Sequence, residues 1–388
     1  MEKTWRWFGK NDQISLETLR QIGVEGIVTA LHSISNGEIW SLAAINEHKD
    51  YIESKGLRWS VVESLPVSEA IKFGGENRDQ LIENYMISLE NLGKAGVTTV
   101  CYNFMPVLDW ARTDLFHTLE DGSSSLFFDK AKFAYFDIHI LERVGAEKEY
   151  SQQVLERMEF FREKATEQDR KDLVDAVIVK TQGFVNGNIK EDDLNPIALF
   201  KSLLALYDGI DKHQLRENLK YFLEKIMPVC EKWGIQMCVH PDDPPFALLG
   251  LPRIVTNEED IDWLLNAVNH PNNGLTFCAG SLSANLANDV PTLAKKYASR
   301  TKFVHLRSTQ VDQNENFIEA SHLSGSGQLI EVVKVFEKEN PSLPIRVDHG
   351  RLLTEDIDKG YNPGYSFLGR MLALGQIDGV MATVKTLS

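Results

Sequence analysis

Ile345-Arg346-Val347-Asp348-His349-Gly350-Arg351 is the stretch of sequence that decides the fold. A short, mainly apolar run stops abruptly at adjacent Asp and His residues, which are followed by Gly and Arg. This pattern is typical of a buried strand that delivers ionisable groups at its C-terminal end. Barrels and open α/β sheets keep their catalytic groups at that end of their strands. The stretch therefore predicts the last strand of an α/β enzyme, with functional residues directly after it.

Three earlier segments repeat this pattern, and their apolar residues stop at a potential metal ligand. The segments are Gln236-Met237-Cys238-Val239-His240, Leu275-Thr276-Phe277-Cys278 and Lys302-Phe303-Val304-His305. From His240 through Cys278 and His305 to Asp348 the intervals are 38, 27 and 43 residues, each about the length of one strand-plus-helix unit. Parallel strands in a barrel would bring these four side chains to one rim, which predicts a metal site.

The rest of the chain also alternates between strand-like and helix-like segments. Strand-like runs lie at 26–31, 59–63 and 98–104, and helical segments lie at 15–22, from about 40 to 55 and at 78–94. Such alternation implies parallel strands. A length of 388 residues suits one (β/α)₈ TIM barrel with an insertion. The position of strand four stays open between Val177-Ile178-Val179-Lys180 and the aromatic segment near Phe136.

The stretch from 116 to 195 breaks the alternation. It begins with a turn at Asp121-Gly122-Ser123-Ser124-Ser125 and continues into a highly charged helical region from about Leu141 to Val174. We interpret it as a mostly helical insertion within a single catalytic domain that spans residues 1–388. It would serve as a lid or an oligomer contact, and the simpler alternative is a solvated charged face.

Composition and charge exclude some classes of function. A net charge of −15 argues against a nucleic acid partner, because no basic face is apparent that could neutralise phosphates. The N-terminus lacks the pattern of a signal peptide, and no apolar run approaches the roughly 20 residues that span a bilayer. Four scattered cysteines suit free thiols in a reducing compartment. We expect a cytoplasmic protein without a membrane partner.

The residue types at the strand ends indicate the chemistry. A single buried His or Cys is more often structural, but four candidates at successive strand ends favour a metal site. Two imidazoles, a thiolate and a carboxylate fit Zn²⁺, Fe²⁺ or Mn²⁺ and discriminate poorly among them. His349 and Tyr365, which follows an Asn-Pro-Gly turn, are candidates for proton transfer. Arg307 and Arg351 are candidates for binding a substrate carboxylate.

Longer motifs run through nearly the whole chain. They are Thr4-Trp5-Arg6-Trp7-Phe8-Gly9, Val28-Thr29-Ala30-Leu31-His32, Asn36-Gly37-Glu38-Ile39-Trp40, Tyr102-Asn103-Phe104-Met105-Pro106-Val107-Leu108-Asp109-Trp110, His240-Pro241-Asp242-Asp243-Pro244-Pro245, Phe277-Cys278-Ala279-Gly280-Ser281, Val304-His305-Leu306-Arg307, Glu319-Ala320-Ser321-His322-Leu323, Val347-Asp348-His349-Gly350-Arg351 and Asn362-Pro363-Gly364-Tyr365. In this order they resemble the mannonate dehydratases of hexuronate degradation, particularly the longer bacterial form with an insertion in the first half of the barrel.

The resemblance implies a TIM-barrel hydro-lyase that uses Mn²⁺ or Fe²⁺ to convert D-mannonate into 2-dehydro-3-deoxy-D-gluconate and water. Its metal ligands match His240, Cys278, His305 and Asp348. Its His and Tyr that take part in dehydration match His349 and Tyr365. We add Asn103 to the substrate-binding candidates. A homo-oligomer is compatible with the resemblance, and the choice of metal stays open.

Two alternative functions are compatible with the same residues. A related barrel could isomerise or epimerise a sugar with the same metal, moving a proton without losing water. The chain could also bind a sugar acid without turnover. The pair of proton-transfer candidates beside the metal ligands argues against a pure binding protein. In the dehydration we expect one of His349 and Tyr365 to remove the C2 proton and the other to protonate the departing C3 hydroxyl, and the sequence does not assign the two steps.

Overall fold

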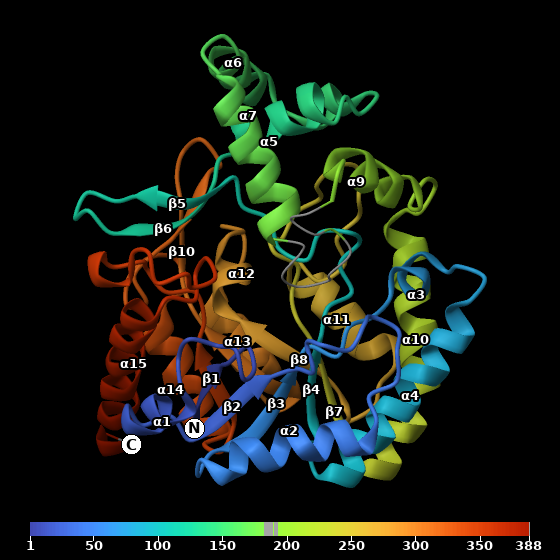
Figure 1. Cartoon of the computed structure of the whole chain (residues 1–388), viewed down its shortest axis with the longest axis vertical. Coiled ribbons are helices and arrows are strands. Elements are labelled where there is room, and N and C mark those ends of the chain that lie inside the picture. Colours follow the sequence, from blue (N-terminus) through green and yellow to red (C-terminus); the bar gives the residue numbers. More distant parts are fainter. Residues whose placement is uncertain (182–188, 190–192, 388) are drawn as a thin grey trace.

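The computed structural model describes residues 1–181, 189 and 193–387. Within these residues, eight parallel strands close into a barrel in the order β1-β12-β9-β8-β7-β4-β3-β2 (Figure 1). Their bounds are β1 (Glu2–Arg6), β2 (Gly26–Thr29), β3 (Arg58–Glu63), β4 (Thr99–Tyr102), β7 (Gln236–Val239), β8 (Asn273–Cys278), β9 (Thr301–Leu306) and β12 (Pro344–Val347). The predicted (β/α)₈ TIM barrel is therefore confirmed.

The strand register aligns the residues on which the site depends. Every residue of β2 and β8 is buried, as expected for barrel strands that are covered on both faces. Cys278 pairs with His305 across β8 and β9, and His305 pairs with Arg346 across β9 and β12. These three residues consequently lie at one level of the barrel wall, and Asp348 lies two positions beyond Arg346.

Helices surround the barrel (Figure 1). They are α1 (Leu16–Gln21), α2 (Leu42–Ser54), α3 (Glu69–Phe73), α4 (Arg78–Ala95), α10 (Lys212–Trp233), α11 (Glu258–Ala267), α12 (Ala279–Ser283), α13 (Val290–Tyr297), η4 (Ala298–Arg300), α14 (Leu329–Glu339), η5 (Thr354–Asp356) and α15 (Phe367–Leu387). In α10, Leu215, Leu219 and Phe222 form a buried stripe at helical spacing. Its ends follow from the sequence, because Asp211 caps the first turn and Gly234 adopts the left-handed conformation that stops it.

The insertion combines a hairpin with helices and lies at one end of the barrel (Figure 1). Its hairpin strands β5 (Asp114–Thr118) and β6 (Ser124–Phe128) extend into a four-stranded antiparallel sheet with β11 (Phe317–Glu319) and β10 (Thr309–Val311). Because β10 begins directly after β9, this sheet lies at the C-terminal end of the barrel strands. The helical elements are α5 (Lys130–Tyr135), η1 (Phe136–Ile140), η2 (Ala146–Glu149), α6 (Gln152–Arg162), α7 (Glu167–Val174) and η3 (Asp175–Lys180). The helix α9 (Pro196–Ala205) follows the insertion.

Both candidates for strand four are wrong. Phe136 begins the π-helical turn η1, and Val177–Lys180 belongs to the π-helical turn η3. Phe136, Val177 and Ile178 pack into the apolar cluster of the insertion, and a short apolar run does not by itself distinguish a strand from a buried helix. The strand that the sequence analysis missed is β1, which carries three charged residues among its five and therefore lacks the usual apolar signature.

The four cysteines are buried and unpaired, as expected for free thiols. No helix in the described part of the chain combines the length and hydropathy needed to cross a bilayer.

Candidate active site

The structure brings the four predicted metal ligands together. Cys278 and His305 belong to β8 and β9, while His240 and Asp348 directly follow β7 and β12. These four strands are consecutive neighbours in the barrel wall. The ligand atoms of His240, Cys278 and His305 all lie within 4.8 Å of one another. His240 Nε2 is 3.1 Å from His305 Nδ1, and a carboxylate oxygen of Asp348 is 3.6 Å from the same nitrogen. Side chains that are far apart in the sequence thus converge on one point at the C-terminal rim.

The ionisation states suit a cation. Burial opposes ionisation of Cys278, but Arg307 and His240 outweigh it and hold the pKa of the thiol well below its ordinary value. Burial likewise opposes ionisation of Asp348, and Arg346 and His349 lower the pKa of this carboxyl well below its usual range. A thiolate and a carboxylate beside two imidazoles form a donor set that fits a divalent transition metal. The residues present therefore fit the metal that the resemblance implies.

Glu63 and Arg346 orient the His305 ring from behind. Glu63 Oε1 lies 3.3 Å from His305 Nε2, and Arg346 Nε lies 3.2 Å from it. This leaves Nδ1 facing His240 and Asp348. Arg346 also donates to Asp348 Oδ1 at 2.5 Å, so that one guanidinium fixes two of the candidate ligands. Neither residue was predicted from the sequence, although Glu63 stands at the end of a strand as the predicted ligands do.

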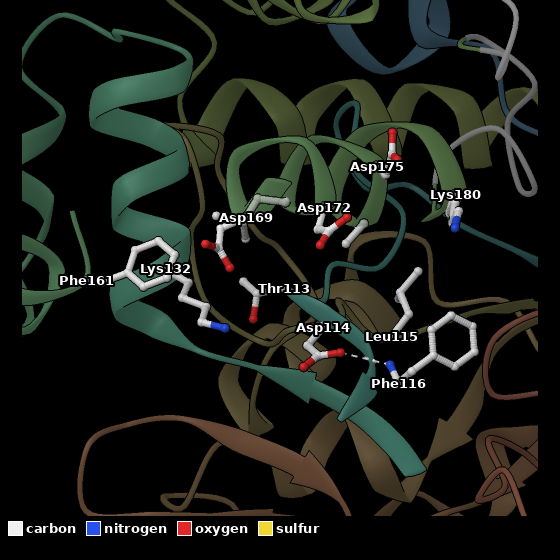
Figure 2. A pocket seen from close by; sticks show the side chains of 12 residues that line it. Thr113, Asp114, Leu115, Phe116, Lys132, Phe161, Asp169, Asp172, Asp175 and Lys180 are labelled. Atoms are coloured by element: carbon white, nitrogen blue, oxygen red, sulfur yellow. Dashed lines mark hydrogen bonds between the residues drawn. The ribbon is translucent and has the colours of Figure 1, made fainter. Parts of the chain in front are cut away.

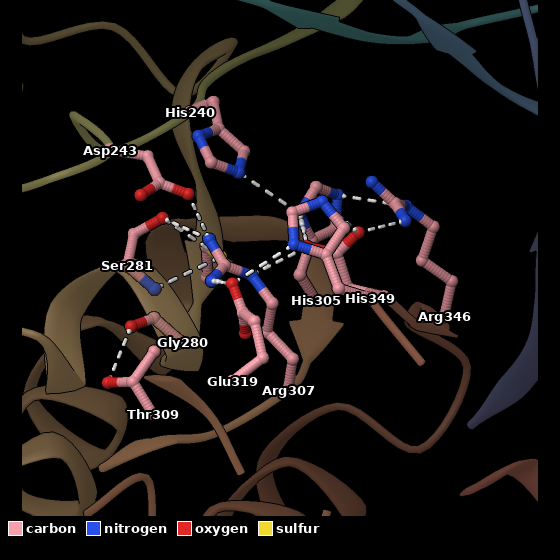
Figure 3. Close-up of polar contacts among 12 residues, drawn as sticks. His240, Asp243, Gly280, Ser281, His305, Arg307, Thr309, Glu319, Arg346 and His349 are labelled. Atoms are coloured by element: carbon pink, nitrogen blue, oxygen red, sulfur yellow. Dashed lines mark hydrogen bonds and ion pairs between the residues drawn. The ribbon is translucent and has the colours of Figure 1, made fainter. Parts of the chain in front are cut away.

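Arg307 lies at the centre of a buried ionic network (Figure 3). Its Nε donates to Asp348 Oδ2 at 2.8 Å, Nη1 donates to Glu319 Oε1 at 2.7 Å, and Nη2 donates to Asp243. Arg112 approaches Asp243 and Glu319 from the other side at 2.8 and 2.6 Å. Burial opposes ionisation of Glu319, but Arg307 and Arg112 outweigh it and lower its pKa to about 2. The guanidinium nitrogens of Arg307, a candidate for binding a substrate carboxylate, are therefore all engaged by protein carboxylates.

His349 and Tyr365 face each other beside this network. Their rings lie nearly perpendicular, with centroids 5.3 Å apart. Glu319 Oε1 lies 3.1 Å from His349 Nδ1, and the Trp110 ring covers His349 at 5.2 Å. Burial, followed by the charge of Asp348, raises the pKa of Tyr365 above its ordinary value, so the phenol keeps its proton at neutral pH.

A cavity with about 60 Å³ of open space lies between these groups. His240, Asp348, His349, Tyr365, Arg307 and Asn103 all line it, together with Arg6, Glu63 and Arg346. Asn103 directs its amide to Asp109 at 2.8 Å. Arg351 is not brought to this cavity. Its guanidinium is half-exposed and pairs with Asp121 in the β5–β6 turn at 2.7 Å.

A larger cavity, of about 380 Å³, lies in the insertion between β5 and the helices α7 and η3 (Figure 2). None of the predicted site residues lines it. Its acidic groups serve local structure, since Asp114 accepts from the backbone of Phe116 and Asp169 completes the N-terminal capping box of α7. The converging ionisable groups, rather than the cavity volume, therefore identify the smaller cavity as the candidate active site.

The fold and this cavity define a class of protein, a TIM-barrel enzyme with a candidate divalent-metal site and two candidate proton-transfer groups beside it. The family model described as D-mannonate dehydratase (UxuA) matches residues 1–388. The chain belongs to the D-mannonate dehydratase family.

Individual relatives agree with this assignment. A mannonate dehydratase of Marinomonas sp. (strain MWYL1) is 46% identical over 396 aligned residues, and one of Chromohalobacter salexigens is 43% identical over 397. Each comparison covers 100% of both chains. The crystal structure of mannonate dehydratase from Streptococcus suis serotype 2 is 34% identical, with a TM-score of 0.79, and is matched over 100% of this chain and 95% of that one. The chain is thus a hydro-lyase that dehydrates D-mannonate, which confirms the prediction and disfavours the isomerase and the non-catalytic binding protein.

Proposed function

We propose that the dehydration takes place in the cavity between the metal-ligand candidates and the His349–Tyr365 pair, and that it yields 2-dehydro-3-deoxy-D-gluconate. The observation that supports this site most directly is the convergence of the ligand atoms of His240, Cys278 and His305 within 4.8 Å of one another. His240 lines the cavity that His349 and Tyr365 also line. A hexonate needs both kinds of group, because its C2 hydrogen is a very weak acid and its C3 hydroxyl is a poor leaving group.

We propose Mn²⁺ or Fe²⁺ as the cofactor, held by His240, Cys278, His305 and Asp348. Nitrogen, sulfur and oxygen donors in one set suit a first-row transition metal better than Mg²⁺ or Ca²⁺, which prefer oxygen ligands alone. When bound, such a metal would supply Lewis-acid stabilisation of negative charge on substrate oxygens.

His349 is the proposed base. Glu319 accepts a hydrogen bond from Nδ1–H, and this interaction leaves the Nε2 lone pair free to remove the C2 proton. Glu319 is itself held by Arg112 and Arg307, so the imidazole has a fixed orientation. The Trp110 ring packs against the imidazole, with the ring centroids 5.2 Å apart.

Tyr365 is the proposed acid. Its raised pKa keeps the phenol protonated, and its ring lies at right angles to that of His349. When the C2–H bond breaks, the electron pair is first delocalised into the adjacent carboxylate. It then forms a C2–C3 double bond as the C3–O bond breaks, and the phenol proton leaves with the hydroxyl as water. The resulting enol then loses its C2 hydroxyl proton, takes up a proton at C3 and becomes the 2-keto acid.

The site is tested by assaying D-mannonate turnover with metal-stripped protein to which Mn²⁺, Fe²⁺ or Zn²⁺ is added back. We expect activity with Mn²⁺ or Fe²⁺ and a coloured thiobarbiturate adduct, which 2-keto-3-deoxy acids give and isomerised sugars do not. Full activity of the metal-stripped protein in the presence of a chelator would refute the proposed cofactor. Consumption of substrate without the adduct would refute dehydration.

The two proton-transfer roles are separable by isotope exchange at C2 in heavy water. We expect Tyr365→Phe to stop water loss while substrate C2–H still exchanges with solvent, because the base is intact. His349→Asn should stop both exchange and water loss. The reverse pattern would assign the base to Tyr365.

A further inference from the structure

Among the described residues, three arginines line the active-site cavity, and two of them are already engaged. Arg307 directs all three guanidinium nitrogens to protein carboxylates. Arg346 does the same, with Nε and Nη2 each 3.0 Å from Glu63 and Nη1 at 2.5 Å from Asp348. Either guanidinium could bind a substrate carboxylate only by giving up an existing ion pair with a buried protein carboxylate, which is unfavourable.

Arg6, the third arginine, is the last residue of β1 and keeps unused hydrogen-bonding capacity. Nη1 donates to the backbone oxygen of Glu63, while the nearest carboxylate oxygen of Glu63 is 3.6 Å away, beyond a normal hydrogen bond. The Nε atom of Arg6 is buried and has no hydrogen-bonding partner within the described residues. A buried donor without an acceptor is costly, and an acceptor on a ligand would remove that cost.

The position of Arg6 suits the reaction. Its Cζ lies 5.3 Å from the centre of the Phe8 ring, a contact that restricts the plane of the guanidinium. The same Phe8 ring packs edge-on against Tyr365 at 5.2 Å. On the other side, Glu63 connects Arg6 to His305 of the metal-ligand set through a 3.3 Å contact. Arg6 therefore lies between the proposed acid and the candidate metal site.

We propose that Arg6 anchors the carboxylate of the substrate, an inference that rests on the proposed site of dehydration. The guanidinium presents a planar pair of donors that matches a carboxylate. Anchoring C1 in this way holds the adjacent C2 beside His349 and Tyr365. The fixed positive charge also stabilises the negative charge that grows on the carboxylate while C2 loses its proton. Arg6 would thus select sugar acids over neutral sugars and polyols of the same length.

The test compares a charged and a neutral ligand on the metal-loaded full chain. For the wild type, Arg6→Gln and Arg6→Lys, we would measure KM and kcat for D-mannonate and the inhibition constant of D-mannonamide, its uncharged amide. We expect Arg6→Gln to raise KM for D-mannonate by roughly tenfold to a hundredfold, the usual loss for hydrogen bonds to a charged group, and to leave D-mannonamide binding nearly unchanged. Arg6→Lys should lie between the two, because it keeps the charge and loses the paired donors.

Arg58→Gln is the matched control. Arg58 begins β3 at the opposite end of the barrel wall, where it is largely exposed and pairs with Glu2 at 2.6 Å. Arg58→Gln removes a guanidinium from an ion pair outside the cavity. The KM for D-mannonate and the inhibition constant of D-mannonamide should therefore stay at their wild-type values.

Several outcomes would overturn the proposal that Arg6 anchors the substrate carboxylate. An unchanged KM for D-mannonate in Arg6→Gln would do so. Equally weakened binding of D-mannonate and D-mannonamide would indicate a structural role for Arg6 instead. If Arg6→Gln does not fold, Arg6→Lys decides, because wild-type preference for the charged ligand in that variant would refute paired binding. Lack of turnover in the wild type itself would instead refute dehydration, which separates the two proposals.

Discussion

His322 is a buried histidine next to the ionic network, and it makes stability depend on pH. It is 4% exposed, and its Nε2 has no hydrogen-bonding partner among the residues that the structure describes. Burial lowers the pKa of His322 to about 4, although the carboxylates of Asp348 and Glu319 act in the opposite direction. The same imidazole takes up a proton below about pH 6.5 in the unfolded chain. Because only the unfolded chain gains this proton, stability is lost as the pH falls from about 6.5 towards 4.

We predict that His322→Gln removes this contribution. In the wild type, protonation of His322 in the unfolded chain should lower the free energy of unfolding by about 2 kcal/mol between pH 7 and pH 5. Urea denaturation of both proteins at the two pH values measures the difference. His117→Gln, which changes a half-exposed imidazole in the β5 strand, should keep the full pH dependence of the wild type. Identical pH dependence in His322→Gln and the wild type would show that His322 is not neutral in the folded protein.

Single residues were predictable where the local pattern carries the information. His240, Cys278, His305 and Asp348 each follow an apolar run, and the barrel then brings them together. The engagement of Arg307 was not predictable in this way, because its partners Asp243 and Glu319 lie 64 and 12 residues away and only the folded barrel brings them into contact. Roles that depend on what a side chain contacts require the structure.

At the scale of elements, the loop after β12 lies directly on the first turn of α15, and two glycines permit this contact. A Cβ added at Gly369 would lie 1.9 Å from the backbone oxygen of Arg351. A Cβ added at Gly350 would lie 2.8 Å from the backbone nitrogen of Arg370. The close approach fixes the loop that begins with Asp348 and His349, so the helix takes part in positioning the site.

We predict opposite effects for two alanine substitutions in α15. Gly369→Ala should lower the free energy of unfolding by about 3 kcal/mol and reduce turnover, because a backbone atom must move. Gly375→Ala should raise the free energy of unfolding by about 0.5 to 1 kcal/mol and leave turnover unchanged, since an added Cβ there meets nothing within 4 Å. Urea denaturation and D-mannonate assays of both variants check this. Equal stability of the two variants would contradict the packing argument.

Element order was predictable from the alternation of strand-like and helical segments, except where packing decides. The helical segments expected at 15–22 and 78–94 correspond to α1 and α4. Strand β1 was missed because only Thr4 and Trp5 among its five residues are buried. β1 pairs with β2 on one side and with β12 on the other, and this pairing stabilises it as a strand. The local sequence gives no sign of such long-range pairing.

At the scale of the whole molecule, the candidate metal ligands connect four neighbouring strands of the barrel wall. A ligand that binds the folded chain and not the unfolded chain stabilises the fold by mass action. The ionised forms of Cys278 and Asp348 are both opposed by burial, and a bound cation would add to the positive charges that stabilise them. Metal binding should therefore be visible as thermal stability, independently of turnover.

We predict that Mn²⁺ or Fe²⁺ at about one hundred times its dissociation constant stabilises metal-stripped protein by about 2.7 kcal/mol. For a chain of this length that corresponds to a rise in Tm of about 3 °C. Cys278→Ser should lose both this rise and D-mannonate turnover, because a hydroxyl is a far weaker ligand than a thiolate. Cys230→Ser is the matched control, since Cys230 is equally buried but belongs to α10, outside the cavity, and it should keep the metal-induced rise in Tm. Full activity and an unchanged metal-induced rise in Tm in Cys278→Ser would remove Cys278 from the metal site. If both variants lost the rise in Tm, the cause would be general destabilisation rather than loss of a ligand.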